Sequence, residues 1–194
     1  MASVNLQGHY NPPTYIDTRI DVYAFLVISE TDVLLVDTGV GAGNDHVERA
    51  FSPRRTLLAG ELARHGVKAK DVDLVVNSHL HFDHCGNNRM FPDADIYVQQ
   101  KELDIARTTA HTVNKWFDYD GARLIAVAGD LEIGAGIELL STPGHTPGHQ
   151  SVLIRTDDEV VLIAAQAAFT ADEYEVYFSH DATVVRPNDD HHEP

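Results

Sequence analysis

The chain has 194 residues, 43% of them hydrophobic, which suits a single domain, residues 1–194, with a sizeable core and a polar tail from about residue 187. A formal net charge of -16 argues against a nucleic-acid partner or an anionic lipid surface, because both would repel the protein. No apolar run reaches the length of a membrane span and the first residues carry no export signal, so we expect a cytoplasmic protein. The single cysteine, Cys85, agrees with a reducing compartment.

The predicted elements begin with a strand pair. Residues 20–29 and 32–39 are apolar runs, and the polar residues between them predict a hairpin turn. The glycine-rich residues 39–45 are interpreted as a mobile loop near the active site. Apolar spacing over residues 55–66 predicts a helix with Gly66 as its C-terminal cap.

The middle and end of the chain are predicted to be mostly strands. The continuous apolar run at residues 72–78 predicts a buried strand that ends directly at His79. A short helix is expected at residues 101–110, and further strands are expected at residues 95–100, 123–129, 136–142, 149–156, 159–165 and 175–180. Hairpin strands with a few helices between them favour two sheets packed face to face, with helices outside.

The segment "HLHFDHCG", residues 79–86, is the main functional candidate. On an extended segment His79, His81 and Asp83 point to one side, and His84 joins them if the following "CGNN" turns the chain. Imidazoles and carboxylates are ligands for zinc and similar first-row metals, so the spacing predicts a metal site. The alternative is a polar loop whose histidines bond only to backbone and water.

"HLHFDH" resembles the signature of the metallo-β-lactamase fold hydrolases, and "VDTG" (residues 36–39) and "TPGHTPGHQS" (residues 142–151) follow that family's order. The wording is most similar to the N-acyl homoserine lactonase branch. The resemblance implies an α+β fold, a four-layer αββα sandwich, and a zinc-dependent hydrolase that opens a lactone ring. The implied small-molecule substrate is an N-acyl homoserine lactone, which makes quorum quenching the expected activity.

The resemblance also implies the roles of individual residues. His79, His81 and His145 are expected to hold one zinc ion, whose bound water becomes hydroxide near pH 7 and attacks the lactone carbonyl. Asp83, His84 and His180 are the expected ligands of a second ion. Asp83 is also expected to protonate the departing alkoxide, although tight metal binding and proton donation compete at one carboxylate.

Other residues of these motifs receive structural roles. Asp37 is predicted to orient a ligand histidine, with a strand-end turn as the other interpretation. His149 is predicted to be structural rather than a ligand, and Cys85 to pack as a small apolar residue. Phe82 lines the substrate side or is buried, and the sequence leaves both open.

Two residues depart from the family pattern. Gln166 stands where the family has an aspartate that bridges two metals, and a neutral amide coordinates weakly. We therefore expect one or two zinc ions, with the second bound more weakly. Phe169 replaces a tyrosine that hydrogen-bonds the lactone carbonyl, and losing such a donor costs on the order of 10²–10³ in rate. Phe169 is thus a substrate-side candidate or a core residue.

A third departure from the family pattern is the length of the connection between the last two predicted strands. Only a short segment separates the strand with Gln166 from the predicted strand at 175–180 that ends at His180. Either the two strands pair in another way, or the chain lacks a helix near its C-terminus. These departures keep rival functions open: a thioester or other ester hydrolase of the superfamily, a β-lactam hydrolase, or a metal-binding member without activity. The sequence predicts no oligomeric state.

Overall fold

Two five-stranded sheets form the body of the protein, seen in a computed structural model that describes residues 8–10, 20–134, 136–167 and 183–184. The first sheet has the order β3-β4-β5-β6-β7, with bounds Phe25–Ile28, Val33–Val36, Leu74–Val76, Asp95–Gln99 and Leu124–Val127. The second has the order β12-β11-β10-β9-β8, with bounds Thr183–Val184, Val160–Ile163, Gln150–Arg155, Ile137–Ser141 and Leu131–Gly134. β1 (Gly8–Tyr10) and β2 (Ile20–Val22) form a separate antiparallel pair.

The direction of the strands decides where loops meet. β4, β5, β6 and β7 run parallel, so the segments that follow β4 and β5 leave the first sheet at the same edge. The second sheet is antiparallel from β8 to β11. The segment between β9 and β10 is therefore a hairpin-type connection, and it carries the second predicted ligand motif.

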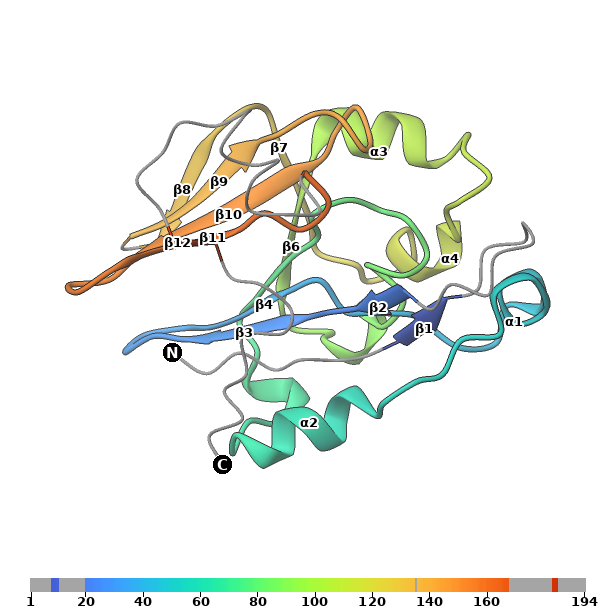
Figure 1. Ribbon diagram of the computed structural model, residues 1–194, viewed down its shortest axis with the longest axis horizontal. Helices are drawn as coiled ribbons and strands as arrows, with labels where there is room; N and C mark the ends of the chain where they lie inside the picture. Colours follow the sequence, from blue (N-terminus) through green and yellow to red (C-terminus); the bar gives the residue numbers. More distant parts are fainter. Residues whose placement is uncertain (1–7, 11–19, 135, 168–182, 185–194) are drawn as a thin grey trace.

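The core lies on both faces of the first sheet. Its inner face packs against the second sheet through apolar residues of both, including Val27, Leu34, Val76, Leu139 and Val152. Its outer face packs against helical residues such as Val47, Leu58, Leu62 and Leu103. The helices among the described residues are α1 (Asp45–Phe51), α2 (Leu58–Arg64), α3 (Gln100–Ala106) and α4 (Asn114–Phe117), with 3₁₀ turns at Ala69–Asp71 and Asn88–Met90. Figure 1 shows α2 beneath β3 and β4, on the side away from the second sheet.

The predicted α+β class with stacked sheets is confirmed, and three layers of the sandwich lie within the described residues. On the outer face of the second sheet, Leu153, Leu162 and Ala164 form a small apolar cluster. No residue of a described helix belongs to that cluster, and the apolar residues packed against it, Leu140 and Val160, are strand residues. Within the same residues, no helix is both long and apolar enough to cross a membrane.

Several local predictions are confirmed and others need correction. The hairpin of β3 and β4 forms, and α2 is followed by Gly66 at a φ of 74°. The predicted strand at 20–29 is in fact two, because the chain passes from the β1-β2 pair into the first sheet between β2 and β3. Part of the region after the predicted loop is helical: the Asn44 side chain accepts hydrogen bonds from two backbone N–H groups and begins α1.

The described parallel partner of β11 comes after the predicted strand at 175–180 in the chain. β11 pairs in parallel with β12, at Thr183–Val184, so residues 164–182 join the two strands. That length exceeds the roughly dozen residues that a parallel crossover needs. The predicted strand at 175–180, and with it His180, lies outside the described residues, as does Phe169.

Candidate metal centre

The three histidines of the predicted first metal site come from two loops, one on each sheet. His79 and His81 follow β5, and His145 lies between β9 and β10. The loops meet because Gln150 joins the sheets at this edge: its N–H donates to Ser78 O at 2.8 Å and its side-chain amide donates to Asn77 O at 2.9 Å. His81 and His145, which are 64 positions apart in the chain, are thereby brought into contact.

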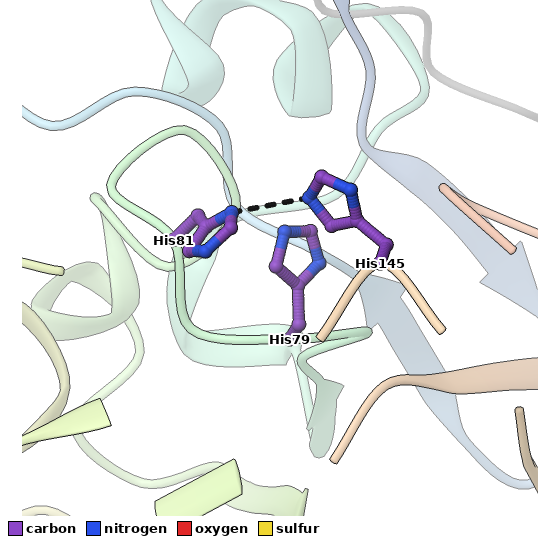
Figure 2. A group of neighbouring side chains, drawn as sticks. All are labelled: His79, His81 and His145. Carbon is purple, nitrogen blue, oxygen red and sulfur yellow. Dashed lines mark hydrogen bonds between the residues drawn. The ribbon is translucent and has the colours of Figure 1, made fainter. Parts of the chain in front are cut away.

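The three imidazoles converge on one point, as Figure 2 shows. One potential ligand atom from each of His79, His81 and His145 lies within 4.8 Å of the others. His145 Nε2 and His81 Nδ1 are 3.1 Å apart. His79 Nε2 is buried and has no hydrogen-bond partner within the described residues. A buried nitrogen without a partner is costly, and a metal ion would satisfy it, so the cluster fits the predicted ion.

The protonation of the cluster also suits a cation. Burial, followed by the nearby charge of His84, holds the pKa of His79 well below its usual range. Burial lowers the pKa of His81 to about 4, against a smaller upward effect of Asp83. The pKa of His145 is lowered as well, first by burial. Neutral imidazole is the form that binds metal, and all three rings are neutral at pH 7.

Asp37 contacts His84, the histidine of the motif that lies outside the three-histidine group. Its carboxylate accepts hydrogen bonds from Ser78 N–H and Ser78 Oγ, each at 2.7 Å, and lies 2.7 Å from His84 Nδ1. Asp37 follows β4 with a φ of 59°, a left-handed conformation that aspartate tolerates better than most residues. The carboxylate therefore fixes the orientation of the His84 ring through Nδ1, while the role of His84 as a metal ligand stays a prediction.

His84, Asp83 and Gln166 lie beside the cluster. The rings of His79 and His84 have centroids 4.1 Å apart, and His84 Nε2 is 3.7 Å from Asp83 Oδ2. Burial lowers the pKa of His84, but the charges of Asp37 and Asp83 outweigh burial and raise it to about 9. The Gln166 amide adds to that rise, and its Oε1 is buried without a hydrogen bond of normal geometry among the described residues.

The turn that brings His84 to the cluster begins earlier than predicted. His84 N–H donates to His81 O at 3.0 Å, so the chain turns within the motif and not after it. The extended arrangement expected from residue 79 to residue 83 is therefore wrong. This turn places the His84 ring next to the His79 ring and in contact with Asp37.

His149 belongs to a hydrogen-bond chain and not to the cluster of ligands. Its Nε2 accepts from Gln166 N–H at 3.2 Å, so its Nδ1 donates to Thr142 Oγ1 at 2.8 Å. The Thr142 hydroxyl contacts Ser151 Oγ at 2.9 Å, and Ser151 donates to Ala164 O at 3.2 Å. Both ring nitrogens are used, in agreement with the predicted structural role.

His149 gives the metal-free protein a measurable acid sensitivity. Burial lowers its pKa from 6.5 to about 3, so His149 is neutral in the folded chain where the unfolded chain binds a proton. The stability that this group contributes is complete above pH 6.5 and is lost as the pH falls toward 3, by about 1.4 kcal/mol per pH unit. In chelator, we expect the free energy of unfolding, measured by urea titration, to fall below pH 6.5, and His149→Gln to reduce this slope. Equal slopes for both proteins would contradict the assignment.

Two motif residues lie in the core. Phe82 is 4% exposed and stacks on Phe51 with ring centroids 4.5 Å apart, so of the two interpretations the structure has the buried one. Its contact with a substrate stays a prediction. Cys85 is fully buried, and its thiol points to the backbone oxygens of Leu80 and His81. Burial raises the pKa of this thiol well above its usual range, so it packs as the predicted neutral residue.

Three residues at the site were not predicted. Ser78 holds Asp37, and its position before the histidine motif was the only signal for it. His111 lies in an exposed segment with its ring 5.4 Å from the His81 ring, and its O accepts from Phe82 N–H. Glu102 is 1% exposed and contacts both ligand loops. A glutamate in the first turn of a helix gives no sign in the sequence that it is buried.

The structure thus combines two stacked sheets with a three-histidine cluster at one edge that could hold a metal ion. The family model "Metallo-beta-lactamase superfamily" matches residues 17–193, and the chain belongs to that superfamily. Among its relatives is an N-acyl homoserine lactonase of Bacillus cereus, 32% identical over 170 residues, which cover 81% of this chain and 68% of the relative.

Solved structures agree with this placement. A mutant of Bacillus thuringiensis AiiA with N-decanoyl-L-homoserine at its active site matches with a TM-score of 0.73 and 27% identity, covering 91% of this chain and 80% of that one. An N-acyl homoserine lactone hydrolase with N-hexanoyl-L-homoserine bound at its catalytic metal centre matches with a TM-score of 0.72, the same identity and the same coverage.

Proposed function

We propose that this protein is a zinc-dependent hydrolase that opens the ring of N-acyl homoserine lactones. The observation that carries the proposal is the convergence of His79, His81 and His145, with a buried His79 Nε2 that lacks a partner among the described residues. The lactonase relatives support the choice of a lactone, since one of them holds a ring-opened product at its metal centre. His79, His81 and His145 would hold the ion, which would supply Lewis acidity that lowers the pKa of water and polarises a carbonyl.

The protein's own groups supply the remaining steps. Asp37 fixes the ring of His84, so that its Nε2 faces Asp83. Asp83 is part-buried at the cluster, and we assign it the proton that the departing alkoxide takes up, because an alkoxide is a poor leaving group at pH 7. The core position of Phe82 closes one side of the motif to water.

We propose that the working site holds one tightly bound ion. The ligands assigned to a second ion are Asp83, His84 and His180, with Gln166 as a weak fourth. Gln166 brings no negative charge to a place where two divalent ions would repel each other strongly. The first site needs none of these residues, since its three imidazoles complete a tetrahedral set with one open position.

One experiment tests the substrate and the stoichiometry together. Metal content and ring opening of an N-acyl homoserine lactone are measured on the same preparation, with a Gln166→Asp variant beside it. We expect one tightly bound zinc ion and turnover in the wild type, and a second bound ion in the variant. Two tightly bound ions in the wild type would contradict the single-ion site.

The chief rival is a metal-binding member of the superfamily without hydrolytic activity, and the neutral Gln166 is the observation that favours it. That rival predicts a wild-type protein that binds zinc but opens no lactone, with activity appearing in Gln166→Asp. A panel of thioester and β-lactam substrates in the same assay separates the other hydrolases of the superfamily. Zinc-free protein in every preparation would contradict the proposed function altogether.

A further inference from the structure

Glu102 joins the two loops that carry the metal-site histidines. It lies in the first turn of α3, and its side chain is buried at 1% exposure. Its Oε1 accepts from the N–H of Leu80, the residue between His79 and His81, at 2.9 Å. Its Oε2 accepts from the hydroxyl of Thr146, the residue after His145, at 2.6 Å.

The backbone packs as closely as these hydrogen bonds imply. A Cβ atom at Gly148 would lie 2.2 Å from the backbone nitrogen of Glu102 and 2.5 Å from its Cα. The loop with His145 therefore rests directly on the start of α3. The loop with His79 and His81 follows a strand of the first sheet, and the loop with His145 joins two strands of the second. The two oxygens of the Glu102 carboxylate therefore accept hydrogen bonds from loops of different sheets.

We infer that Glu102 is a positioning residue that fixes the separation of His145 from His79 and His81, and thereby the affinity of the cluster for a metal ion. A buried carboxylate is expensive unless its hydrogen bonds are complete, and both oxygens here are used on ligand loops. Small displacements of ligands weaken a metal site, and residues that orient ligands typically contribute 10–100-fold in affinity. The inference rests on the proposed metal site and adds a residue to it.

Substitutions of Glu102 distinguish the effect of its two hydrogen bonds from the effect of its side-chain volume. Glu102→Leu keeps the approximate volume and removes both acceptors. Glu102→Gln keeps both links, because its carbonyl accepts from Leu80 N–H while its amide donates to the Thr146 hydroxyl. Thr146→Val and Thr146→Ser repeat the comparison from the other side, since serine keeps the hydroxyl and valine lacks it.

The measurements are zinc affinity by chelator competition and the visible absorption spectrum of the Co²⁺-loaded protein, which reports coordination geometry. We expect Glu102→Leu to lose about 10–100-fold in zinc affinity with an altered Co²⁺ spectrum, and Glu102→Gln to stay within about tenfold with the wild-type spectrum. Thr146→Val is expected to weaken zinc binding more than Thr146→Ser.

A neighbouring core residue provides the control for lost stability. Leu103 is 7% exposed in the same helix, and Leu103→Ala leaves a cavity in the core without removing the Glu102 hydrogen bonds. Equal losses of zinc affinity in Leu103→Ala and Glu102→Leu would overturn the inference, as would wild-type affinity in Glu102→Leu. A wild type that binds no zinc overturns the proposed function and this inference together, whereas zinc binding that is indifferent to Glu102 overturns the inference alone.

Discussion

Replacing His145 with alanine should remove metal from the protein and lower lactone hydrolysis by on the order of 10³-fold or more. His145 is exposed in its loop and supplies one of the three nitrogens of the cluster, so its loss leaves two ligands and little else changes. Metal content by mass spectrometry and initial rates at saturating zinc measure the two effects.

His111→Ala is the matched control for His145→Ala. His111 is also exposed and its ring lies near His81, but it is not part of the three-histidine group. The control variant should keep its zinc. Full metal content in His145→Ala, or an equal loss in both variants, would contradict the site as described.

Gly86→Ala is the substitution with the largest expected effect on folding. A Cβ at residue 86 would lie 1.8 Å from the backbone nitrogen of Gly41 and 2.6 Å from Gly39 O. Gly86 N–H also donates to Gly39 O at 2.9 Å, so the two segments touch through their backbones and no flexible side chain can yield. We expect a loss of at least about 3 kcal/mol in the free energy of unfolding, measured by chemical denaturation.

The other ligand loop offers a comparison for Gly86→Ala. Apart from its chain neighbours, no described residue has a heavy atom within 4 Å of a Cβ added at Gly144, so Gly144→Ala should leave the free energy of unfolding within about 0.5 kcal/mol of the wild type. A Gly86→Ala protein as stable as Gly144→Ala would show that the two backbone segments separate more readily than their contact implies.

The parts of the site that short motifs encode could be predicted from the sequence. His79, His81 and His145 meet as expected because each sits directly after or between strands whose order is fixed by the fold. Asp37 reaches His84 because a carboxylate at a strand end beside a parallel neighbour lies at the same edge of the sheet. Where a residue directly follows a strand, the topology of the sheet determines its position in space.

What the sequence did not reveal depends on packing between distant segments. Glu102 contacts residues 22 and 44 positions away, and nothing in its own neighbourhood marks that meeting. The break between β2 and β3 is similar, because the apolar run is continuous and only the pairing partners differ. α1 was recoverable, since Asn44 is a good helix-start residue and Val47 and Phe51 share one face.

The hydrogen-bond chain through His149 has a consequence for the comparison of Gln166 with aspartate. The chain starts at the backbone N–H of residue 166 and returns, through Thr142 and Ser151, to the backbone oxygen of Ala164. The chain of hydrogen bonds therefore fixes the backbone on both sides of Ala165 and does not involve the side chain of Gln166. Exchanging that side chain removes none of these hydrogen bonds, so we expect Gln166→Asp to change the charge and reach presented to the histidines while the main chain keeps its place.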